Sequence, residues 1–535
     1  MTVAREMAGQ PQSGPVRSLG AISGWRAYGL AAVLGAIAGL GFAPLNFVPA
    51  FALGISGLVW LAAEAPTRRK GFAVGWWWGL GHFAVNSYWI AESFLVDAER
   101  FGWMIPPVLG GLAAYLAVYP ALATLAFRLL HPGNSNGRLS VAGIAAFAAF
   151  WTIGEWLRGH VLTGYPWDLA AYIWSGSDSM MQSAALWGSW GLSLVTVFAL
   201  GLPALFALMQ CRAALKATIG MALVLGALYL GGMARLWQAD HVMREAGDPT
   251  NVRIVQPNIA QSLKMDRDTR PQQIQTLMRL TLETPGFDGV KAVIWPETAA
   301  NYLLERDPTL RGLLAQAAPR DGLLLTGAPR GEPLDGPLTE IWNSFAVLDD
   351  RGQILGTADK FHLVPLGEYV PLRGIFPFIN KLTPGSMNFT PGPGPRTLHT
   401  PGLPPFSPLI CYEVIFPGAV VDAKDRPALI VNVTNDGWFG TSTGPSQHFA
   451  TARFRSVEEG IPMLRAANTG ISGVIDAYGR VETRSNLVVE AVIDATIPPP
   501  LSSPPFARFG LLAVLPLIVL ALIPILFRVR KSSIS

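Results

Sequence analysis

The stretch SPLICYEVIFP, residues 407–417, places one of the two cysteines of the chain at the end of a short apolar run. A strand that ends on a nucleophile and turns into a helix presents that side chain at a sheet edge, where backbone N–H groups converge. Cys411 is therefore the candidate nucleophile. The simpler alternative is a structural cysteine, because free cysteine is among the most buried residue types.

Two other segments carry groups that a cysteine nucleophile requires. In AVIWPET the apolar run stops before Glu297, which places this carboxylate at a strand end, where α/β active sites are usually assembled. In ADKFHLVPLGEYVP, Lys360 and Glu368 lie on either side of a bend containing Pro and Gly. A thiol needs a base, and a carbonyl under attack needs positive charge or N–H donors for its oxyanion. Glutamate and lysine supply both functions without histidine.

Each of these residues also has a simpler interpretation. A glutamate after proline is often a helix cap, and a lone lysine is usually solvated. Glu368 could serve only as an ion-pair partner of Lys360 or Arg373. The joint pattern is more specific than its members, so the elements that position the three segments decide between the interpretations.

Residues 250–500 alternate between strand and helix patterns separated by Pro/Gly turns, which predicts a layered α/β domain. The predicted strands are 252–256, 291–295, 322–327, 341–348, 406–410, 428–433, 463–467 and 472–476. The predicted helices are 270–283, 307–317 and 445–460. The Pro- and Gly-rich residues 384–405 are expected to form a long surface loop or lid.

The chain as a whole is too hydrophobic for a soluble protein. Half of its 535 residues are hydrophobic and 14% are charged, against about 25% charged residues in a typical globular domain. Apolar stretches close to the ~20 residues that cross a bilayer occur at 25–43, 46–63, 71–91, 104–130, 141–157, 182–209, 214–234 and 506–527. The predicted parts are a tail (1–24), a membrane domain with seven transmembrane helices (25–240), the α/β domain (250–500), an eighth transmembrane helix (506–527) and a basic tail (528–535).

Basic residues alternate between the predicted loops. Arg68, Arg69 and Lys70 separate the second and third stretches, and Arg212 and Lys216 separate the sixth and seventh, whereas the alternate loops carry acidic residues. The positive-inside rule therefore places both termini in the cytoplasm and the α/β domain outside. At the outer end of the fifth stretch, we expect Glu155 and Arg158 to form a local ion pair, or Arg158 to meet a lipid phosphate.

Composition and spacing also limit the partners. A net charge of +4 is a weak argument for a nucleic-acid partner, and the seven histidines and two cysteines show no metal-ligand spacing. We expect no metal, no cofactor and no nucleic acid.

The motifs WPE, K-x-H-L-V-P-x-G-E-Y-V-P and I-C-Y-E resemble the Glu-Lys-Cys triad of the nitrilase, or carbon–nitrogen hydrolase, superfamily. NVTNDGWFG and the residues that follow it look like the remaining core of that fold, an αββα sandwich. The resemblance implies Glu297 as general base, Lys360 as oxyanion stabiliser and Cys411 as the acylated nucleophile. It implies supporting roles for further residues near the triad: Glu368, Tyr412, Glu413 and, as a structural neighbour, Asn343.

Together with GFAPLNF and EWLRG…TGYPWD, residues 25–530 resemble the apolipoprotein N-acyltransferase family. This implies a bacterial inner-membrane enzyme, with its catalytic domain on the periplasmic side, that transfers an acyl chain to the amino-terminal diacylglyceryl-cysteine of lipoproteins. The implied donor is a phospholipid, phosphatidylethanolamine by resemblance. One departure is Met265, which stands where relatives often have tryptophan.

Two other functions remain open from the sequence. The same triad could serve a membrane-tethered amidase or nitrilase that acts on a soluble substrate. A binding or transport protein with an inactive nitrilase-like domain is the second alternative. The intact triad argues against the inactive protein, and the predicted spans argue against the soluble substrate.

Overall fold

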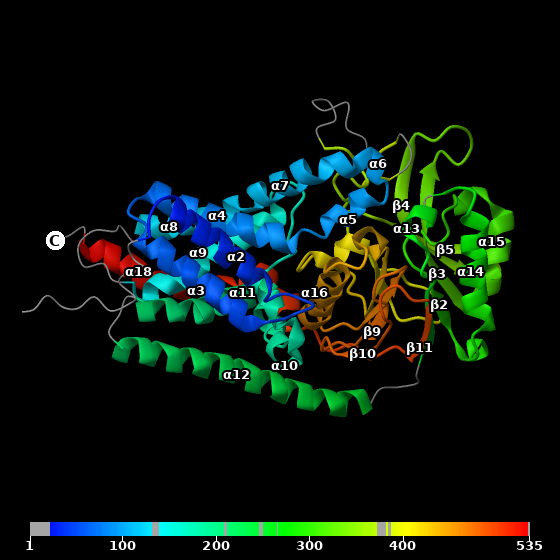
Figure 1. The fold of residues 1–535 in the computed structure, drawn as a ribbon. Coiled ribbons are helices and arrows are strands. Elements are labelled where there is room, and N and C mark those ends of the chain that lie inside the picture. The colour runs from blue at the N-terminus through cyan, green and yellow to red at the C-terminus, as the bar shows by residue number, and fades with distance from the viewer. Residues whose placement is uncertain are drawn as a thin grey trace, which may run out of the picture.

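The computed structural model describes residues 22–130, 139–207, 211–244, 250–264, 266–371, 381–383 and 387–532. Met265, most of the amino-terminal tail and the last three residues of the basic tail lie outside the described residues. Figure 1 shows two halves, with long helices at one end of the molecule and β-sheets at the other. The carboxyl-terminal helix returns from the sheets to the helical end.

The helical half is built from tightly packed apolar helices. Glycines permit the close approach, since a Cβ on Gly35 would lie 1.9 Å from the carbonyl oxygen of Trp78, and one on Gly81 would lie 2.0 Å from that of Ala32. The main helices are α2 (Trp25–Gly39), α3 (Val48–Glu64), α4 (Arg68–Asn86), α5 (Ile90–Leu95), α7 (Ile105–Leu116), α8 (Val118–Leu130), α9 (Val141–His160), α11 (Ala184–Gly201) and α12 (Cys211–Arg244). Short helices connect them, namely α6 (Ala98–Phe101), η1 (Gly102–Met104), η2 (Ala170–Gly176), α10 (Asp178–Met181) and η3 (Leu202–Ala207).

Four helical segments of the described residues are long and apolar enough to cross a membrane: Ala98–Leu130, Ala184–Phe206, Ala214–Ala239 and Pro505–Pro524. Val48–Glu64 is apolar but shorter. The other predicted stretches coincide with helices that are shorter or less apolar. Helix α12 runs beside the other helices for much of its length (Figure 1) and leaves apolar side chains such as Leu223 and Trp237 exposed.

Two sheets form the other half. The six-stranded sheet has the order β11-β1-β2-β3-β4-β5, and the five-stranded sheet has the order β10-β9-β8-β7-β6. The strands of the first sheet are β1 (Asn251–Gln256), β2 (Ala292–Ile294), β3 (Leu323–Glu332), β4 (Glu340–Asp349), β5 (Ile354–Asp359) and β11 (Ala491–Thr496). Those of the second are β6 (Phe406–Ile410), β7 (Leu429–Thr434), β8 (Met463–Ala467), β9 (Gly473–Ile475) and β10 (Val481–Arg484).

The sheets pack face to face between helices, as the sequence predicts. Ile254 and Phe345 of the first sheet share one apolar core with Phe406 and Ile430 of the second. Helix α14 (Arg270–Glu283) covers the outer face of the first sheet, where Leu277 packs in a separate core. The remaining helices are α13 (Gln261–Lys264), η4 (Phe287–Gly289), η5 (Leu304–Arg306), α15 (Pro308–Leu314), η6 (Ala315–Ala317), η7 (Cys411–Ile415), η8 (Asp436–Phe439), α16 (Gly444–Glu459), α17 (Pro505–Phe509), η9 (Gly510–Ala513) and α18 (Leu515–Ser532).

Helix α16 joins the two halves. Its Phe449 packs in the core between the sheets, and its Phe454 packs in the core of the helical half. The Oε1 atom of Gln447 on the same helix accepts a 2.8 Å hydrogen bond from Trp167 Nε1. Farther along, Glu458 Oε1 accepts 2.7 Å and 2.6 Å hydrogen bonds from the backbone N–H and the hydroxyl of Ser189. Since these contacts are buried, the sandwich is fixed against the helical half.

The predicted strands and helices of the α/β half are confirmed, most of them within two residues of the observed bounds. The sequence does not predict strands β5, β10 and β11. All three lie at sheet edges, and they consist largely of half-buried and exposed residues with a mixed polar composition. The continuous apolar runs that identify buried strands are therefore missing there.

Candidate active site

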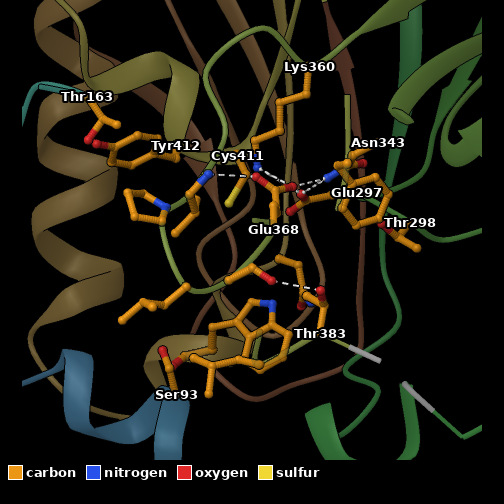
Figure 2. Close-up of a pocket in the computed structure, with 18 of the residues that line it drawn as sticks. Ser93, Thr163, Glu297, Thr298, Asn343, Lys360, Glu368, Thr383, Cys411 and Tyr412 are labelled. Atoms are coloured by element: carbon orange, nitrogen blue, oxygen red, sulfur yellow. Dashed lines mark hydrogen bonds and ion pairs between the residues drawn. The ribbon is translucent and has the colours of Figure 1, made fainter. Parts of the chain in front are cut away.

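Cys411 lies at the junction between strand β6 and the 3₁₀ turn η7. Its φ of 53° lies in the left-handed region, which a residue with a side chain adopts only when surrounding structure enforces it. The enforcement comes from burial, since every residue of β6 and η7 is buried. The sharp turn directs the thiol into a cavity (Figure 2), as the sequence predicts for a nucleophile at a strand end.

Glu297 and Lys360 reach the same point from the facing sheet. Glu297 follows strand β2, and Lys360 follows strand β5. Lys360 Nζ lies 3.4 Å from Glu297 Oε1 and 3.0 Å from Glu368 Oε1. All three side chains are more than nine-tenths buried, so these ion pairs are shielded from water.

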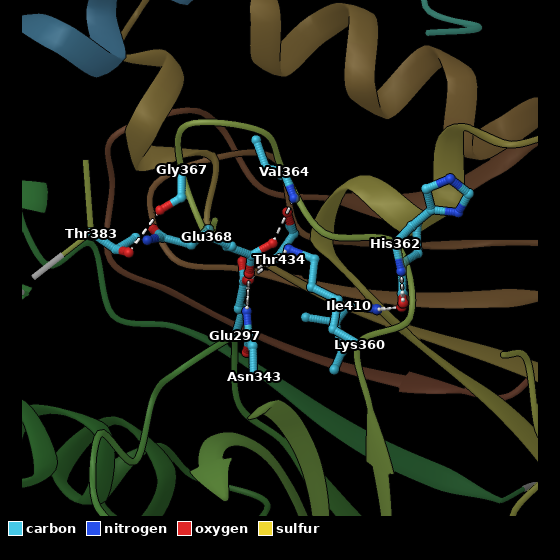
Figure 3. A network of polar contacts seen from close by, with 12 residues as sticks. Glu297, Asn343, Lys360, His362, Val364, Gly367, Glu368, Thr383, Ile410 and Thr434 are labelled. Atoms are coloured by element: carbon cyan, nitrogen blue, oxygen red, sulfur yellow. Dashed lines mark hydrogen bonds and ion pairs between the residues drawn. The ribbon is translucent and has the colours of Figure 1, made fainter. Parts of the chain in front are cut away.

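Asn343 completes this group, which we call the catalytic cluster: Glu297, Asn343, Lys360 and Glu368. Its Nδ2 donates to Glu297 Oε1 at 2.7 Å and to Glu368 Oε1 at 2.8 Å. Asn343 stands on the long strand β4, whose pairing with β3 and β5 holds it rigidly. Figures 2 and 3 show both carboxylates gathered on the amide nitrogen and the lysine amine.

Backbone N–H groups orient two of the buried glutamates. The backbone N–H of Val364 donates to Glu368 Oε2 at 2.8 Å. Glu413 Oε1 accepts from the N–H of Phe361 at 2.6 Å, and its Oε2 accepts from the N–H of Ile410 at 2.7 Å (Figure 3). Glu413 thus links the segment after Lys360 to the strand that ends at the cysteine.

Tyr412 connects the site to the helical half. Its hydroxyl donates a 2.9 Å hydrogen bond to the carbonyl of Gly164, in the loop after α9.

Glu155 and Arg158, near that loop, do not hydrogen-bond to each other as the local ion pair expected from the sequence would require. Each has other partners. Arg158 donates to the carbonyls of Tyr165 at 2.8 Å and Asp168 at 3.0 Å, and Glu155 Oε1 accepts from Trp151 and the N–H of Ala170.

The charges around Cys411 set its resting state. Burial raises the pKa of the thiol to about 12, and the carboxylate of Glu297 also raises it, whereas Lys360 lowers it. Burial lowers the pKa of Lys360, but Glu368 and Glu297 outweigh burial and raise it above its usual range. At neutral pH the site therefore holds a protonated thiol beside a lysine cation.

Lys264 on α13 is a buried lysine that the sequence analysis missed. Its Nζ donates a 2.9 Å hydrogen bond to the main-chain carbonyl of Glu297. Burial lowers its pKa to about 8, although Glu297 and Cys411 raise it. Lys264 lies in a short polar stretch, QSLK, and only tertiary packing buries its amine, so no sequence pattern identifies it.

Glycine allows strand β3 to approach the main chain of Glu297. A Cβ on Gly327 would lie 2.3 Å from the backbone nitrogen of Thr298 and 2.6 Å from Glu297 Cα. Thr298 itself has a φ of 49°. The main chain at the carboxylate is therefore fixed from both sides, by Gly327 and by the amine of Lys264.

The catalytic cluster, Cys411 and Tyr412 line one cavity of about 610 Å³. Helices α5 and α7 of the helical half supply apolar lining residues: Ile90, Phe94, Val108, Leu112 and Tyr115. Ser93 of α5 lies across the cavity from the cysteine in Figure 2. A few polar groups facing an apolar lining are typical of small-molecule binding sites.

Each half of the chain matches a known protein family. Residues 34–202 match the family described as the apolipoprotein N-acyltransferase N-terminal domain, and residues 251–503 match the carbon-nitrogen hydrolase family. A solved structure of an amidase from Nesterenkonia sp. is 18% identical, covers 47% of this chain and 92% of its own, and has a TM-score of 0.34. The fold and the family matches define a carbon-nitrogen hydrolase domain attached to an apolar helical domain.

The relatives make the assignment more specific. An apolipoprotein N-acyltransferase from Rhodopseudomonas palustris is 37% identical over 523 residues, which cover 95% of this chain and 96% of that protein. One from Brucella melitensis is 38% identical over 496 residues, covering 90% and 91%. The chain belongs to the apolipoprotein N-acyltransferase family, which confirms the resemblance found in the sequence.

Proposed function

We propose that the protein transfers an acyl chain from a phospholipid to the amino-terminal amine of a diacylglyceryl-cysteine in lipoproteins, through a thioester on Cys411. One observation carries this proposal. The cysteine and the catalytic cluster line a single cavity whose opposite wall comes from apolar helices of the helical half. Lipid-bearing substrates can enter such a site from the side of the membrane.

In the first half-reaction, Glu297 accepts the proton of the Cys411 thiol as the sulfur attacks the ester carbonyl of the phospholipid. The oxyanion that forms is stabilised by the ammonium group of Lys360. When the C–O bond breaks, the leaving alkoxide takes the proton from Glu297 and departs as lysophospholipid. The thiol is mostly protonated at rest, so proton transfer to Glu297 has to accompany the attack.

In the second half-reaction, the amine of the acceptor attacks the thioester carbonyl. Lys360 again stabilises the oxyanion, and Glu297 accepts the proton that the nitrogen loses as the amide bond forms. The C–S bond then breaks, and the proton on Glu297 returns to the sulfur of Cys411. Both half-reactions use the same groups, which is the basis of a ping-pong mechanism.

The neighbouring residues act by positioning these groups. Asn343 and Glu368 hold Lys360 and the carboxylate of Glu297 in place. Glu413 fixes the lysine-bearing segment against the strand of the cysteine. Tyr412 fixes the cysteine turn against the helical half.

Trapping the intermediate tests the function. With phospholipid alone, Cys411 should gain one fatty-acyl chain in mass, in an adduct sensitive to neutral hydroxylamine. A diacylated lipopeptide with a free amino terminus should discharge the adduct, whereas the N-acetylated lipopeptide should leave it intact. If phospholipid gives no adduct while small amides or nitriles are turned over, the membrane-tethered amidase function is correct instead.

We further propose eight transmembrane helices, cytoplasmic termini and a periplasmic catalytic domain in the bacterial inner membrane, with phosphatidylethanolamine as donor. The alternation of basic loops supports this orientation. Glu283, the last residue of α14 in the α/β half, and Arg69, in the first turn of α4 in the helical half, are both exposed. With Cys211 replaced by serine, Glu283→Cys should react with an impermeant thiol reagent on intact spheroplasts and Arg69→Cys should not. The reverse labelling would overturn the orientation.

A further inference from the structure

Two arginines line the cavity on its catalytic-domain wall. Arg267 lies in the turn after α13, and Arg270 is the first residue of α14. They are close enough to repel each other, since Arg267 lowers the pKa of Arg270 in addition to the effect of burial. Like charges kept together at a cavity wall indicate a site for an anion.

The guanidinium groups are not engaged by carboxylates of the described residues. The Nε of Arg270 is buried without a hydrogen-bond partner there, and its guanidinium carbon lies 5.6 Å from the ring centre of Tyr302. The nearby carboxylate of Asp266 accepts from the backbone N–H of Asp268, and neither aspartate lines the cavity. The pair therefore keeps donors available for a ligand.

Other cations that line the cavity are already occupied. Arg158 donates to two backbone carbonyls, and Lys360 pairs with Glu297 and Glu368. The wall that holds Arg270 also holds Tyr302, which follows the general base Glu297 by only a few residues. An anion bound by the arginines thus shares one cavity with the group under attack at Cys411.

We propose that Arg267 and Arg270 bind the phosphodiester of the donor phospholipid and place its ester carbonyl at Cys411. This deepens the proposed function and rests on it. Guanidinium groups match phosphate oxygens in charge and geometry. The phosphate and the scissile ester belong to one glycerol unit, so both must occupy the same cavity during acylation.

The chemistry favours the donor over the acceptor as the ligand of this site. Every glycerophospholipid donor carries the phosphate anion. The reacting end of the acceptor carries an amine, which is a cation until it loses its proton, and two arginines repel a cation. The acceptor peptide nevertheless provides an alternative outcome for the test.

The test compares two acyl donors in the acylation of Cys411. Arg267→Gln/Arg270→Gln should raise the KM for phospholipid by about 10- to 100-fold, the effect of losing charge-assisted hydrogen bonds, with little change in kcat. Acylation by p-nitrophenyl palmitate, which has no phosphate, should be unchanged. The double lysine variant keeps the charge and should recover part of the phospholipid KM.

Arg279→Gln is the matched control. Arg279 stands on the same helix as Arg270, half-exposed, and pairs with Glu490 on the surface at 2.8 Å. This variant should have normal KM values for both donors.

Salt dependence provides a further check. Raised salt should increase the phospholipid KM of the native enzyme more than that of the double glutamine variant, because screening acts on the charge that the variant lacks.

Three results would overturn the inference. They are an equal loss with both donors, a normal phospholipid KM, and normal acylation followed by slow discharge to the lipopeptide, which would assign the arginines to the acceptor. Failure of the proposed function is distinguishable, because the native enzyme would then form no adduct with phospholipid at all.

Discussion

Two groups of buried charges lie near Cys411, and only one of them lines the cavity. The catalytic cluster borders the cavity. The second group, which we call the inner cluster, consists of Asn432, Asp436, His448 and Arg465, and each of these residues is 0% exposed. Arg465 Nη2 lies 2.9 Å from Asp436 Oδ2, and His448 Nδ1 lies 2.8 Å from Asp436 Oδ1.

The pairing in the inner cluster is at least as close as that in the catalytic cluster. Burial raises the pKa of Asp436, but Arg465 and His448 outweigh burial and lower it to about 2. Burial and ion pairing therefore do not by themselves identify a catalytic group. Access to the cavity, where a substrate can be reached, separates the catalytic cluster from the inner cluster.

The largest effect should come from the catalytic cluster. Glu297→Gln removes the proposed base and Lys360→Met removes the proposed oxyanion stabiliser, and each should lower the transfer rate by ~10²- to 10³-fold or more. Lys360→Met also leaves two buried carboxylates without a cation, so the rate has to be expressed per folded molecule. Acyl transfer measured per folded enzyme checks this, and near-normal turnover in either variant would make that residue structural.

Substitution in the inner cluster should lower the stability of the fold more than the activity per folded molecule. Arg465→Met leaves the carboxylate of Asp436 hydrogen-bonded to Thr434 and His448 but without its buried cation, which should lower the free energy of unfolding by about 3–5 kcal/mol. Activity per folded molecule should fall far less than in the variants of the catalytic cluster. Thermal unfolding followed alongside single-turnover acylation provides both values, and a stable but inactive variant would erase the distinction between the clusters.

Substitution of Lys264 should have a smaller effect on the rate, through the loss of both a hydrogen bond and a charge. Lys264→Met removes the hydrogen bond to the main chain of Glu297 and a positive charge, so kcat should fall about tenfold near pH 7. Lys264→Gln can keep the hydrogen bond without the charge, and it should recover part of the rate.

The pH dependence of the rate tests the contribution of the Lys264 charge separately. Its pKa in the folded protein is lowered to about 8, so the native enzyme loses this charge as the pH rises through 8, and its advantage over Lys264→Gln should narrow. The folded protein binds fewer protons than the unfolded chain between pH 8 and the usual lysine pKa. The native protein should therefore gain stability relative to the variant as the pH rises through that window. A constant rate ratio from pH 7 to 9 would argue against a role for the charge.

The sequence predicts much of this site because its main groups end apolar strands. Glu297 and Cys411 each follow a buried run of strand formers, and both lie in the cavity. The half-exposed strands β5, β10 and β11 lack that signal. Lys264, Arg267 and Arg270 acquire their surroundings only when α13 and α14 pack against the sheet, which no local pattern contains.

Arg158 shows the same limit in the helical half. A spacing of three residues from Glu155 indicates a local ion pair. In the folded protein the loop after α9 turns back and presents two carbonyls, and Arg158 donates to these. Competition from a tertiary partner cannot be read from local spacing.

The pH dependence of Cys411 alkylation tests most directly whether the catalytic cluster acts on the thiol. With Cys211 replaced by serine, the neutral reagent iodoacetamide reports on Cys411 alone. Native Cys411 should react slowly at pH 7 and faster as the pH rises, because the pKa of the thiol is raised to about 12. Glu297→Gln removes a negative charge and should lower that pKa, whereas Lys360→Met should raise it further. The account thus predicts opposite shifts in two variants that both lose acyl transfer, and shifts in the same direction, or none, would contradict it.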